Sequence, residues 1–522
     1  MEQHCIRHTE LPGASRLFGD LLYRFDRVER FYPHAPYDPD SLERAAREVV
    51  YPDDRRAAVT AALRELNPDC ASLDAFAKPG TVAVVTGQQV GLFGGPLYSV
   101  FKALAAVRSA KDLSDRGVRA VPVFWLATED HDLAEINQFW AFGGDQSPES
   151  LSTAALNPLN GPVGPIAMRD LPLDALRARL RGLPFADEAY ELVASSYREG
   201  ESFGGAFRKL MGELLKPHGV LFVDPLAPAL RNVAAPFLAQ ALRMSGDLVH
   251  GVRERSRELE AAGYHAQVHL EPNASLLFLL DGGKRTVLKR TEKGFNEFAP
   301  EELADRAAAL SPNALLRPVM QDFLLPTAGY LGGPAELAYF AQSRPLYDAL
   351  LGRMPMVGHR ASFTLLDARA AKLTARYGIG LKDIATPDVS LRETMAARLV
   401  PEGLNEKFSS ARCDIEKQLD ALTAAVRGFD PGLEKAVNKS REKMLYQVSK
   451  LERKTAREAM RRDQQATTDA RYLHDLVYPH RHLQERFYGV IPFLARHGMD
   501  LIDRAYECVR PECPDHQVLN LD

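Results

Sequence analysis

The sequence is poor in cysteine and contains no long apolar run, and these two absences exclude several classes of protein. Five cysteines in 522 residues are too few for a disulfide framework. No uninterrupted apolar stretch approaches the roughly 20 residues that span a bilayer. The start, MEQHCIRHTELPG, lacks the basic and then apolar segments of a secretion signal. We therefore expect a cytoplasmic protein that does not enter a membrane.

An excess of charge of either sign is also missing. Lys and Arg total 65 and Asp and Glu total 69, for a net charge of −4. The whole molecule therefore has no bias toward nucleic acid or an anionic membrane. Cys508, Cys513 and His516 lie close together, but their spacing is not that of a zinc site. We interpret the cysteines as ordinary thiols.

The stretch 81–132 carries the strongest local pattern. Val82 to Val85 are consecutive apolar residues, mostly β-branched, as in a strand buried on both faces of a parallel sheet. Several glycines follow, and apolar residues then recur at helical spacing from Leu97 to Val107. A helix that begins after such a loop presents unpaired N–H groups, which suit a phosphate or a carboxylate.

A second buried strand is predicted near Val121 to Ala127, and the polar run TEDHD follows it directly. Ligands of open α/β sheets bind beyond the carboxyl ends of the strands, so we expect Gln88 and His131 to face one crevice. Another buried strand at 219–224 has helical segments before and after it. This alternation predicts an α/β fold with a doubly wound parallel sheet.

The composition and hydrophobic pattern of the sequence divide the chain into eight segments. In order, they are a helical lead-in (1–80), the first half of the core (81–141), a connective insertion (142–215), a return to the core (216–262), a small β-containing insertion (263–310), the second half of the core (311–384), an antiparallel coiled coil (385–480) and a C-terminal segment packed on the core (481–522). Strand candidates in the β insertion include 266–270, and Asp281-Gly282-Gly283 is a hairpin signal. Tyr330-Leu331-Gly332-Gly333 is interpreted as a second glycine loop ahead of a helix.

The segment 385–480 predicts two antiparallel helices joined by the turn Asp430-Pro431-Gly432. We expect the second helix to be the longer one, reaching toward Pro479, and its overhanging seam to bind a second copy in a homodimer. The apolar residues of the first helix alternate spacings of four and three, as in a coiled-coil seam: Ile415, Leu419, Leu422 and Val426. Similar spacing continues in the second: Leu433, Val437, Ser440, Met444, Val448, Leu451 and Thr455.

Motifs along the chain resemble one family. TGQQVGLFGGPLYSVFKA and VPVFWLATEDHDLAEINQ closely resemble the cysteine ligase family of bacillithiol biosynthesis, BshC. Further matches are GYHAQVHL at 263–270, RPVMQDFLLPTAGYLGGPAELAYFAQ at 317–342 and LQERFYGVIPFL at 483–494. The resemblance spans nearly the whole chain. It implies a Rossmann-like core related to class I aminoacyl-tRNA synthetases, with inserted connective segments and a coiled-coil dimerisation domain.

The same resemblance implies the activity, an ATP-dependent ligase that adds L-cysteine to glucosaminyl-malate in the last step of bacillithiol biosynthesis. Such a reaction needs activation of a carboxylate, so ATP is the expected cofactor and Mg²⁺ a candidate one. The protein must supply N–H groups and cations for the phosphates and a base for the amine. The HIGH and KMSKS signatures of the synthetases are absent, so the fold analogy does not identify the loop that binds the adenine nucleotide.

The first group of candidate binding residues follows the first strand. Gln88 and Gln89 could bond a substrate carboxylate or sugar hydroxyls, and Lys102 could contact a phosphate or be solvated. Tyr98 is a further candidate, with simple packing as its alternative. Three glycines are candidates for cradling an anion, and a tight strand-to-helix turn is their structural alternative: Gly91, Gly94 and Gly95.

Four consecutive residues are the candidates for catalysis: Glu129, Asp130, His131 and Asp132. Histidine fits a general base at neutral pH, and carboxylates suit magnesium better than zinc. The structural alternative is a helix N-cap whose acids favour the helix dipole. The sequence leaves both interpretations open.

A second binding wall is expected around the later glycine loop. There Tyr330 could stack on a base or sugar and Glu336 could bind an amine or a ribose, with core packing and a capped helix as the alternative. Arg360, after the last core strand, is a candidate anion clamp. The full set for this wall is Gln321, Asp322, Tyr330, Gly332, Gly333, Glu336 and Tyr339.

An RNA-binding or scaffolding protein and an oxidoreductase are the two alternatives to the ligase. Residues 434–462 contain ten Lys or Arg and four Asp or Glu, so a non-enzymatic RNA-binding or scaffolding protein is the alternative. A solvated coiled-coil surface is favoured because Tyr446 is the only aromatic residue there. A nicotinamide-dependent oxidoreductase is disfavoured because the glycine spacing is not that of a dinucleotide fingerprint.

Overall fold

Five parallel strands form the central sheet of the computed structural model, which describes residues 3–68, 70–157 and 159–521. Their spatial order is β12 (Met356–His359), β11 (Thr327–Gly332), β2 (Val82–Gln88), β3 (Ala120–Leu126) and β6 (Leu221–Val223). The chain starts in the middle, runs to one edge and then continues on the other side, which is the Rossmann arrangement. The predicted doubly wound parallel sheet is therefore confirmed, and its switch point lies between β2 and β11.

Both faces of the sheet are covered by helices, which explains the unbroken apolar runs of its strands. Ala83 and Val85 of β2 face a core built with α10 (Pro228–Arg243), α13 (Arg317–Leu324) and α14 (Pro334–Leu350). Val84 points the other way, toward Ala105 and Ala106 of α5 (Tyr98–Asp115). Side chains alternate between the two faces along a strand, so a strand between two helical layers must be apolar throughout.

Strand β11 corrects the expectation of a glycine loop at 330–333. Thr327–Gly332 pairs in parallel with both β2 and β12, and only Gly333 lies beyond the strand. The glycines that hid this strand allow close packing. A Cβ added to Gly329 would lie 2.7 Å from the Leu42 side chain. Glycine weakens a strand pattern and often marks such a close approach.

The insertions surround the sheet. The hairpin β4 (Gln138–Phe142) and β5 (Pro148–Ser152) leads to α7 (Leu173–Leu180), α8 (Ala186–Ser196) and α9 (Phe203–Leu214). A second insertion forms a four-stranded sheet in the order β10 (Leu310–Pro312), β7 (Ala274–Asp281), β8 (Lys284–Thr291) and β9 (Gly294–Phe295). The predicted hairpin at Gly282-Gly283 joins β7 to β8, whereas 266–270 forms no strand.

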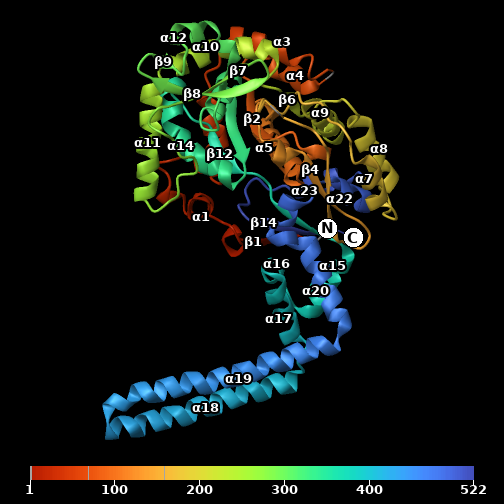
Figure 1. Cartoon of the computed structure of the whole chain (residues 1–522), viewed down its shortest axis with the longest axis vertical. Helices are drawn as coiled ribbons and strands as arrows, with labels where there is room; N and C mark the ends of the chain where they lie inside the picture. Colours follow the sequence, from red (N-terminus) through yellow and green to blue (C-terminus); the bar gives the residue numbers. More distant parts are fainter. Residues whose placement is uncertain (1–2, 69, 158, 522) are drawn as a thin grey trace.

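The two ends of the chain lie side by side in a third sheet (Figure 1). Here β14 (His516–Asn520) pairs with β1 (Gln3–Ile6) and with β13 (Phe363–Leu366). The expected, mostly helical lead-in follows strand β1 and contains α1 (Arg16–Tyr23), α2 (Ser41–Arg47), α3 (Asp53–Leu63) and α4 (Ala71–Phe76).

A long helical hairpin projects from the head of the molecule (Figure 1). It consists of α18 (Glu402–Phe429) and α19 (Glu434–Arg462), which confirms the two predicted antiparallel helices. The expected overhang of the second helix is wrong. The helix breaks at Asp463, which caps α20 (Gln464–Val477), and α17 (Asp388–Arg398) packs against both α19 and α20. Within the described ranges, no helix is long and apolar enough to cross a membrane.

A buried polar network fastens the C-terminal segment to the end of β12. Glu485 on α21 (Gln484–Phe487) accepts two hydrogen bonds from the Arg360 guanidinium, at 2.9 and 2.6 Å, and one from Ser362 Oγ at 2.8 Å. The ring nitrogens of His516 lie 2.8 Å from the hydroxyls of Ser362 and Thr364. Arg360, Glu485 and His516 are 3% exposed or less. Removing one partner from such a network leaves a buried group unsatisfied.

This network predicts a stability that depends on pH. Burial lowers the pKa of His516 from 6.5 to about 4, and the pKa of His8, whose ring centroid lies 5.9 Å away, to about 3. As the pH falls below 6.5, the two histidines bind protons in the unfolded chain but stay unprotonated in the folded protein. The folded state therefore loses stability. A fully buried histidine of this kind contributes a loss of about 2 kcal/mol at about pH 5.

The expected result is a thermal midpoint that falls between about pH 7 and pH 5, with a shallower fall in His516→Gln although that variant is less stable at neutral pH. Scanning calorimetry across this range measures both. His250→Gln, which replaces an exposed histidine, serves as the control and should keep the wild-type slope. Parallel curves for wild type and His516→Gln would show that His516 does not cause the dependence.

Candidate functional site

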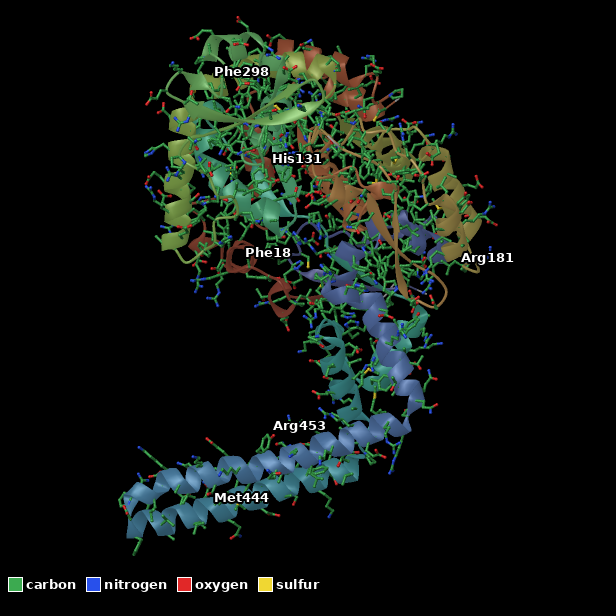
Figure 2. The ribbon with its side chains drawn as sticks, viewed as in Figure 1. Phe18, His131, Arg181, Phe298, Met444 and Arg453 are labelled. Carbon is green, nitrogen blue, oxygen red and sulfur yellow. The ribbon has the colours of Figure 1, made fainter. Side chains whose placement is uncertain are left out.

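A cavity of about 610 Å³ opens at the carboxyl ends of β2, β3 and β11, at the switch point of the sheet. Its walls also include the hairpin β7–β8, the start of α14 and α21. His131 lies in the middle of the head, between the sheet and this hairpin (Figure 2). Gln88 and His131 therefore face one crevice, as the sequence predicts. Twelve predicted site residues line the cavity: Gln88, Gln89, Tyr98, Lys102, Glu129, Asp130, His131, Tyr330, Gly333, Glu336, Tyr339 and Arg360.

A buried ion pair between Lys102 and Glu336 forms the back wall. Lys102 is 2% exposed, and its Nζ lies 2.5 Å from Glu336 Oε2. It also donates to the carbonyl of Gly87 at 2.8 Å and to Gln88 Oε1 at 2.9 Å. Burial lowers the pKa of Lys102, while Glu336 opposes the shift. Lys102 is therefore buried and paired with a counter-ion.

Glu336 caps the helix that follows β11 and is also a member of the ion pair. Its Oε2 accepts the Gly333 N–H at 2.7 Å, which caps α14, and its Oε1 accepts the Tyr330 hydroxyl at 2.5 Å. Burial alone would raise the pKa of Glu336, but Lys102 and these hydrogen bonds bring it below the ordinary value. Tyr330 is fully buried and packs against Phe340, so it is not placed to stack on a ligand base.

Some residues of the acidic loop after β3 support the structure, and others are accessible from the cavity. Glu129 is buried against Arg231 of α10 at 2.8 Å, and burial raises its pKa. Asp132 caps α6 (Leu133–Ile136) by accepting the N–H groups of Ala134 and Glu135, which is the N-cap alternative. Asp130 Oδ2 accepts the Gln89 amide at 2.8 Å, and the Glu135 carboxylate contacts the same nitrogen.

His131 extends from this loop into the cavity and meets an arginine of the inserted hairpin. Its side chain is 41% exposed. Its Nδ1 lies 3.1 Å from a terminal nitrogen of Arg285 on β8. The ring also faces Phe278 of β7, at 6.5 Å between centroids. The inserted sheet therefore closes the cavity over the residue that the sequence places at its centre.

The three candidate glycines lie outside the cavity in a closed turn. The Gly94 N–H donates to the Tyr197 hydroxyl at 3.0 Å, which donates in turn to the Gly91 carbonyl at 2.9 Å. Gly95 N–H bonds the carbonyl of Leu92. Gly94 and Gly95 have φ values of +90° and +66°, a region that favours glycine. The structure therefore corrects the anion-cradle expectation in favour of the tight turn.

Four further predicted residues also have structural positions. Gln321 and Asp322 are buried in the core, where Asp322 accepts hydrogen bonds from Gln321 and from the Tyr347 hydroxyl at 2.6 Å. Gly332 ends β11, where a Cβ would lie 2.9 Å from the Tyr330 ring. Arg360 reaches the cavity but is engaged by Glu485, so it is not a free anion clamp.

Sequence reasoning missed four charged lining residues. Arg317 donates to the Tyr339 hydroxyl at 3.0 Å and to Gln321. Arg486 is exposed, lies 5.7 Å from the Tyr98 ring centroid, and belongs to no ion pair among the residues that the structure describes. Both arginines stand inside motifs that carry the family resemblance, which was the available signal. Glu135 stands inside the motif VPVFWLATEDHDLAEINQ and had the same signal, whereas Arg285 had none.

The His, Cys, Asp and Glu side chains of the described residues do not form a complete set of ligands for a metal ion. Across 3–68, 70–157 and 159–521, no group of three or more His, Cys, Asp and Glu side chains is arranged to hold a metal ion. Mg²⁺ that arrives with phosphates needs only one or two carboxylates. Asp130 and Glu135, which meet at the Gln89 amide, are the pair that fits this requirement.

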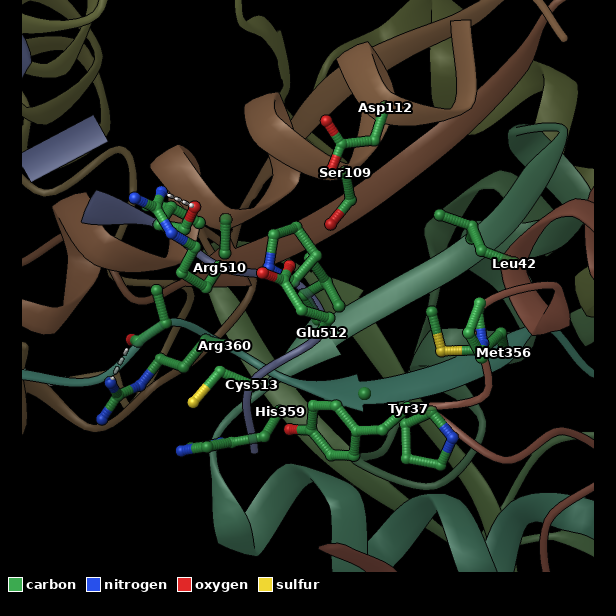
Figure 3. A pocket seen from close by; sticks show the side chains of 18 of the residues that line it. Tyr37, Leu42, Ser109, Asp112, Met356, His359, Arg360, Arg510, Glu512 and Cys513 are labelled. Atoms are coloured by element: carbon green, nitrogen blue, oxygen red, sulfur yellow. Dashed lines mark hydrogen bonds between the residues drawn. The ribbon is translucent and has the colours of Figure 1, made fainter. Parts of the chain in front are cut away.

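A second cavity lies between α2, α5, β12 and the C-terminal segment (Figure 3). Leu42, Ser109 and Met356 surround it, and its lining mixes apolar residues with charged ones such as Asp112, Arg510 and Glu512. Arg360 is the only predicted site residue that it shares with the first cavity. The first cavity is therefore the candidate functional site.

Comparisons with known proteins agree with this architecture. Residues 1–361 match the family model described as "Bacillithiol biosynthesis BshC, N-terminal Rossmann-like domain", and residues 363–521 match "Bacillithiol biosynthesis BshC, C-terminal coiled-coil domain". A protein of Solibacter usitatus is 48% identical over 99% of both chains, and one of Koribacter versatilis is 36% identical over 99% of both. One of Symbiobacterium thermophilum is 33% identical over 91% of this chain and 92% of its own. Each is named "Putative cysteine ligase BshC".

Proposed function

Because the chain belongs to the BshC family of bacillithiol biosynthesis, we propose that it is an ATP-dependent ligase that forms an amide bond between L-cysteine and the amino group of glucosaminyl-malate. The observation that carries the proposal is the cation-lined cavity at the switch point of the sheet. Ligands of this fold bind at that place. ATP-dependent chemistry also puts the reaction in the cytoplasm.

Arg486 is the group best suited to the malate carboxylates. It reaches the cavity from α21 beside Tyr98, whose hydroxyl accepts the Gln88 amide at 3.1 Å and can still donate to a ligand. Lys102 and Arg360 are occupied by buried carboxylates, whereas Arg486 has no such partner among the described residues. A free guanidinium binds a carboxylate through two parallel hydrogen bonds.

The start of α14 is the element best suited to a phosphate. Gly333, Pro334 and Ala335 line the cavity at the N-terminus of a 17-residue helix. The Gly333 N–H is bonded to Glu336, and Pro334 has no N–H. Ala335 is therefore the one of the three whose N–H can meet a ligand. The first N–H groups of a helix lack partners within it, and the helix dipole adds positive charge there. ATP, when bound, supplies the activation that turns a carboxylate into an electrophile. Asp130 and Glu135 are the carboxylates available to bind an ammonium group or Mg²⁺.

The ion pairs of the helical hairpin weaken the RNA-binding alternative. Arg441 pairs with Asp420, Arg457 with Glu393, and Arg461 and Arg462 with Glu458. Four of the ten cations of α19 therefore lie beside an acid. Such pairing of surface charges is typical of a solvated coiled coil and lowers the charge offered to a phosphate backbone.

The reaction can be tested directly. Purified protein is mixed with cysteine, glucosaminyl-malate, ATP and Mg²⁺, and mass spectrometry detects the thiol product. We expect product only when ATP is present, because a free carboxylate is a poor electrophile. Formation of AMP would indicate an adenylated intermediate, and ADP a phosphorylated one. Product without ATP, or no product from folded protein supplied with every component, would contradict the proposal.

Replacing Arg486 tests the assigned substrate contact. Arg486→Ala should raise KM for glucosaminyl-malate about 10- to 100-fold, as expected for a lost hydrogen bond to a charged group, with a smaller change in kcat. Arg481→Ala, in the same segment but outside the cavity, is the matched control and should leave both constants unchanged. A selective rise in KM for ATP would instead assign Arg486 to the nucleotide.

We also propose that the hairpin forms a homodimer through one uncharged face. Its two helices carry exposed apolar side chains that the intramolecular seam leaves uncovered: Leu422 is 50% exposed, Met444 49% and Leu451 57%. They belong to rows of uncharged residues at coiled-coil spacing, here called the neutral stripe: Leu404, Ala411, Gln418, Leu422, Ala425 and Phe429 on α18, Leu433 in the turn, and Ser440, Met444, Gln447, Leu451 and Thr455 on α19. Pairing two such faces gives a four-helix bundle.

Light scattering tests this face. The wild type should have about twice the chain mass of 57.8 kDa. Leu422→Glu combined with Leu451→Glu should give the monomer mass, because packing two copies would bury four carboxylates. Ala421→Glu, on the same helix but off the stripe, is the control and should remain dimeric. A monomeric wild type would refute the proposal.

A further inference from the structure

We propose that Arg285 is a positioning residue that holds His131 with Nδ1 as a hydrogen-bond acceptor, so that the ring proton lies on Nε2. His131 then donates a hydrogen bond into the cavity and does not serve as the general base that the sequence suggests. The catalytic part of this inference rests on the proposed ligase function. The chemical state of the ring does not depend on it.

The contact between the two side chains carries the inference. A terminal nitrogen of Arg285 lies 3.1 Å from His131 Nδ1. A guanidinium nitrogen can only donate a hydrogen bond, because arginine stays protonated in proteins and has no acceptor. Nδ1 must therefore offer its lone pair. A neutral imidazole with Nδ1 as acceptor carries its hydrogen on Nε2.

Arg285 is held so that it cannot turn away from the ring. Its second terminal nitrogen donates to the Pro312 carbonyl at 3.0 Å, and its Nε donates to Ser311 Oγ at 3.4 Å. The guanidinium carbon also lies 3.9 Å from the Phe278 ring centroid. These partners come from β7 and β10 of the inserted sheet. The guanidinium is thus fixed on several sides before it meets His131.

Asp130 is the neighbour that would favour the opposite tautomer. Its Oδ1 lies 3.5 Å from His131 Nδ1, which is longer than a good hydrogen bond. That oxygen already accepts the backbone N–H of His131 at 2.7 Å. Its other oxygen accepts the Gln89 amide. The Asp130 oxygen nearest to Nδ1 is therefore directed at the backbone, and the shorter contact with Arg285 decides the state of Nδ1.

The Nε2–H tautomer assigns His131 a definite chemistry. A nitrogen that carries its proton has no lone pair with which to remove a proton from an amine. It can donate to an oxygen that bears or gains negative charge, such as a phosphate oxygen or the oxyanion of an attacked acyl group. Among the cavity residues, Asp130 and Glu135 are then the acceptors left for the proton of the incoming amine.

Nitrogen NMR tests the ring without substrate. The chain has 14 histidines, so the His131 signals are identified in ¹⁵N-histidine-labelled protein by their loss in His131→Gln. We expect a protonated Nε2 and an unprotonated Nδ1 in the wild type, and a change of this pattern in Arg285→Met. Arg290→Met is the matched control on the same strand, because Arg290 bonds the carbonyls of Pro272 and Ala274 instead. A wild-type ring protonated on Nδ1, or a pattern unchanged in Arg285→Met, would overturn the proposal.

Kinetics then separate a donor from a base. Glutamine retains an N–H donor but cannot take up a proton. His131→Ala should lower kcat about 100-fold, as for a lost oxyanion donor, whereas His131→Gln should lose no more than about tenfold. Equal losses in the two variants would indicate a base. Arg285→Met should lower kcat in the wild type but add little in the His131→Ala background, because it acts through the ring. Additive losses would reduce Arg285 to a structural role.

Discussion

The buried ion pair between Lys102 and Glu336 links the two halves of the sheet at the point where the candidate cavity forms. Two buried charges are costly unless each is fully hydrogen-bonded. Here Lys102 also binds Gly87 and Gln88 at the end of β2, and Glu336 binds Tyr330 and Gly333 at the end of β11. The strand ends, the start of α14 and the back of the cavity therefore depend on one pair.

Around this pair, distant parts of the chain each bring one cation to the cavity. The inserted sheet brings Arg285 to His131, and the C-terminal segment brings Arg486 to Tyr98. The bidentate contact of Arg360 with Glu485 holds the second of these parts in place. The cavity is thus completed only when the core, the insertion and the C-terminal segment are assembled, which joins ligand binding to the whole fold.

Several polar residues that looked functional in the sequence turn out to support the backbone. Asp132 caps a helix, Glu129 balances Arg231, and the glycines after β2 close a turn with Tyr197. Strand ends at a buried crevice leave many backbone groups without sheet partners, and each buried group needs a bond. Functional and supporting residues therefore share the same loops, and only their contacts distinguish them.

Local pattern by itself determined much of this protein: β2, β3 and the helices after them, the antiparallel hairpin, the family, and the meeting of Gln88 and His131. The spacing of apolar residues and the order of strands along the chain are local features, so the sequence itself shows them. Tertiary structure alone decided the rest. Strand β11 forms despite its glycines because it is paired on both sides, α17 packs on α19 and α20 where an overhang was expected, and Arg285 meets His131 across 154 residues. Such partners are fixed by packing between distant segments, which leaves no local signal in the sequence.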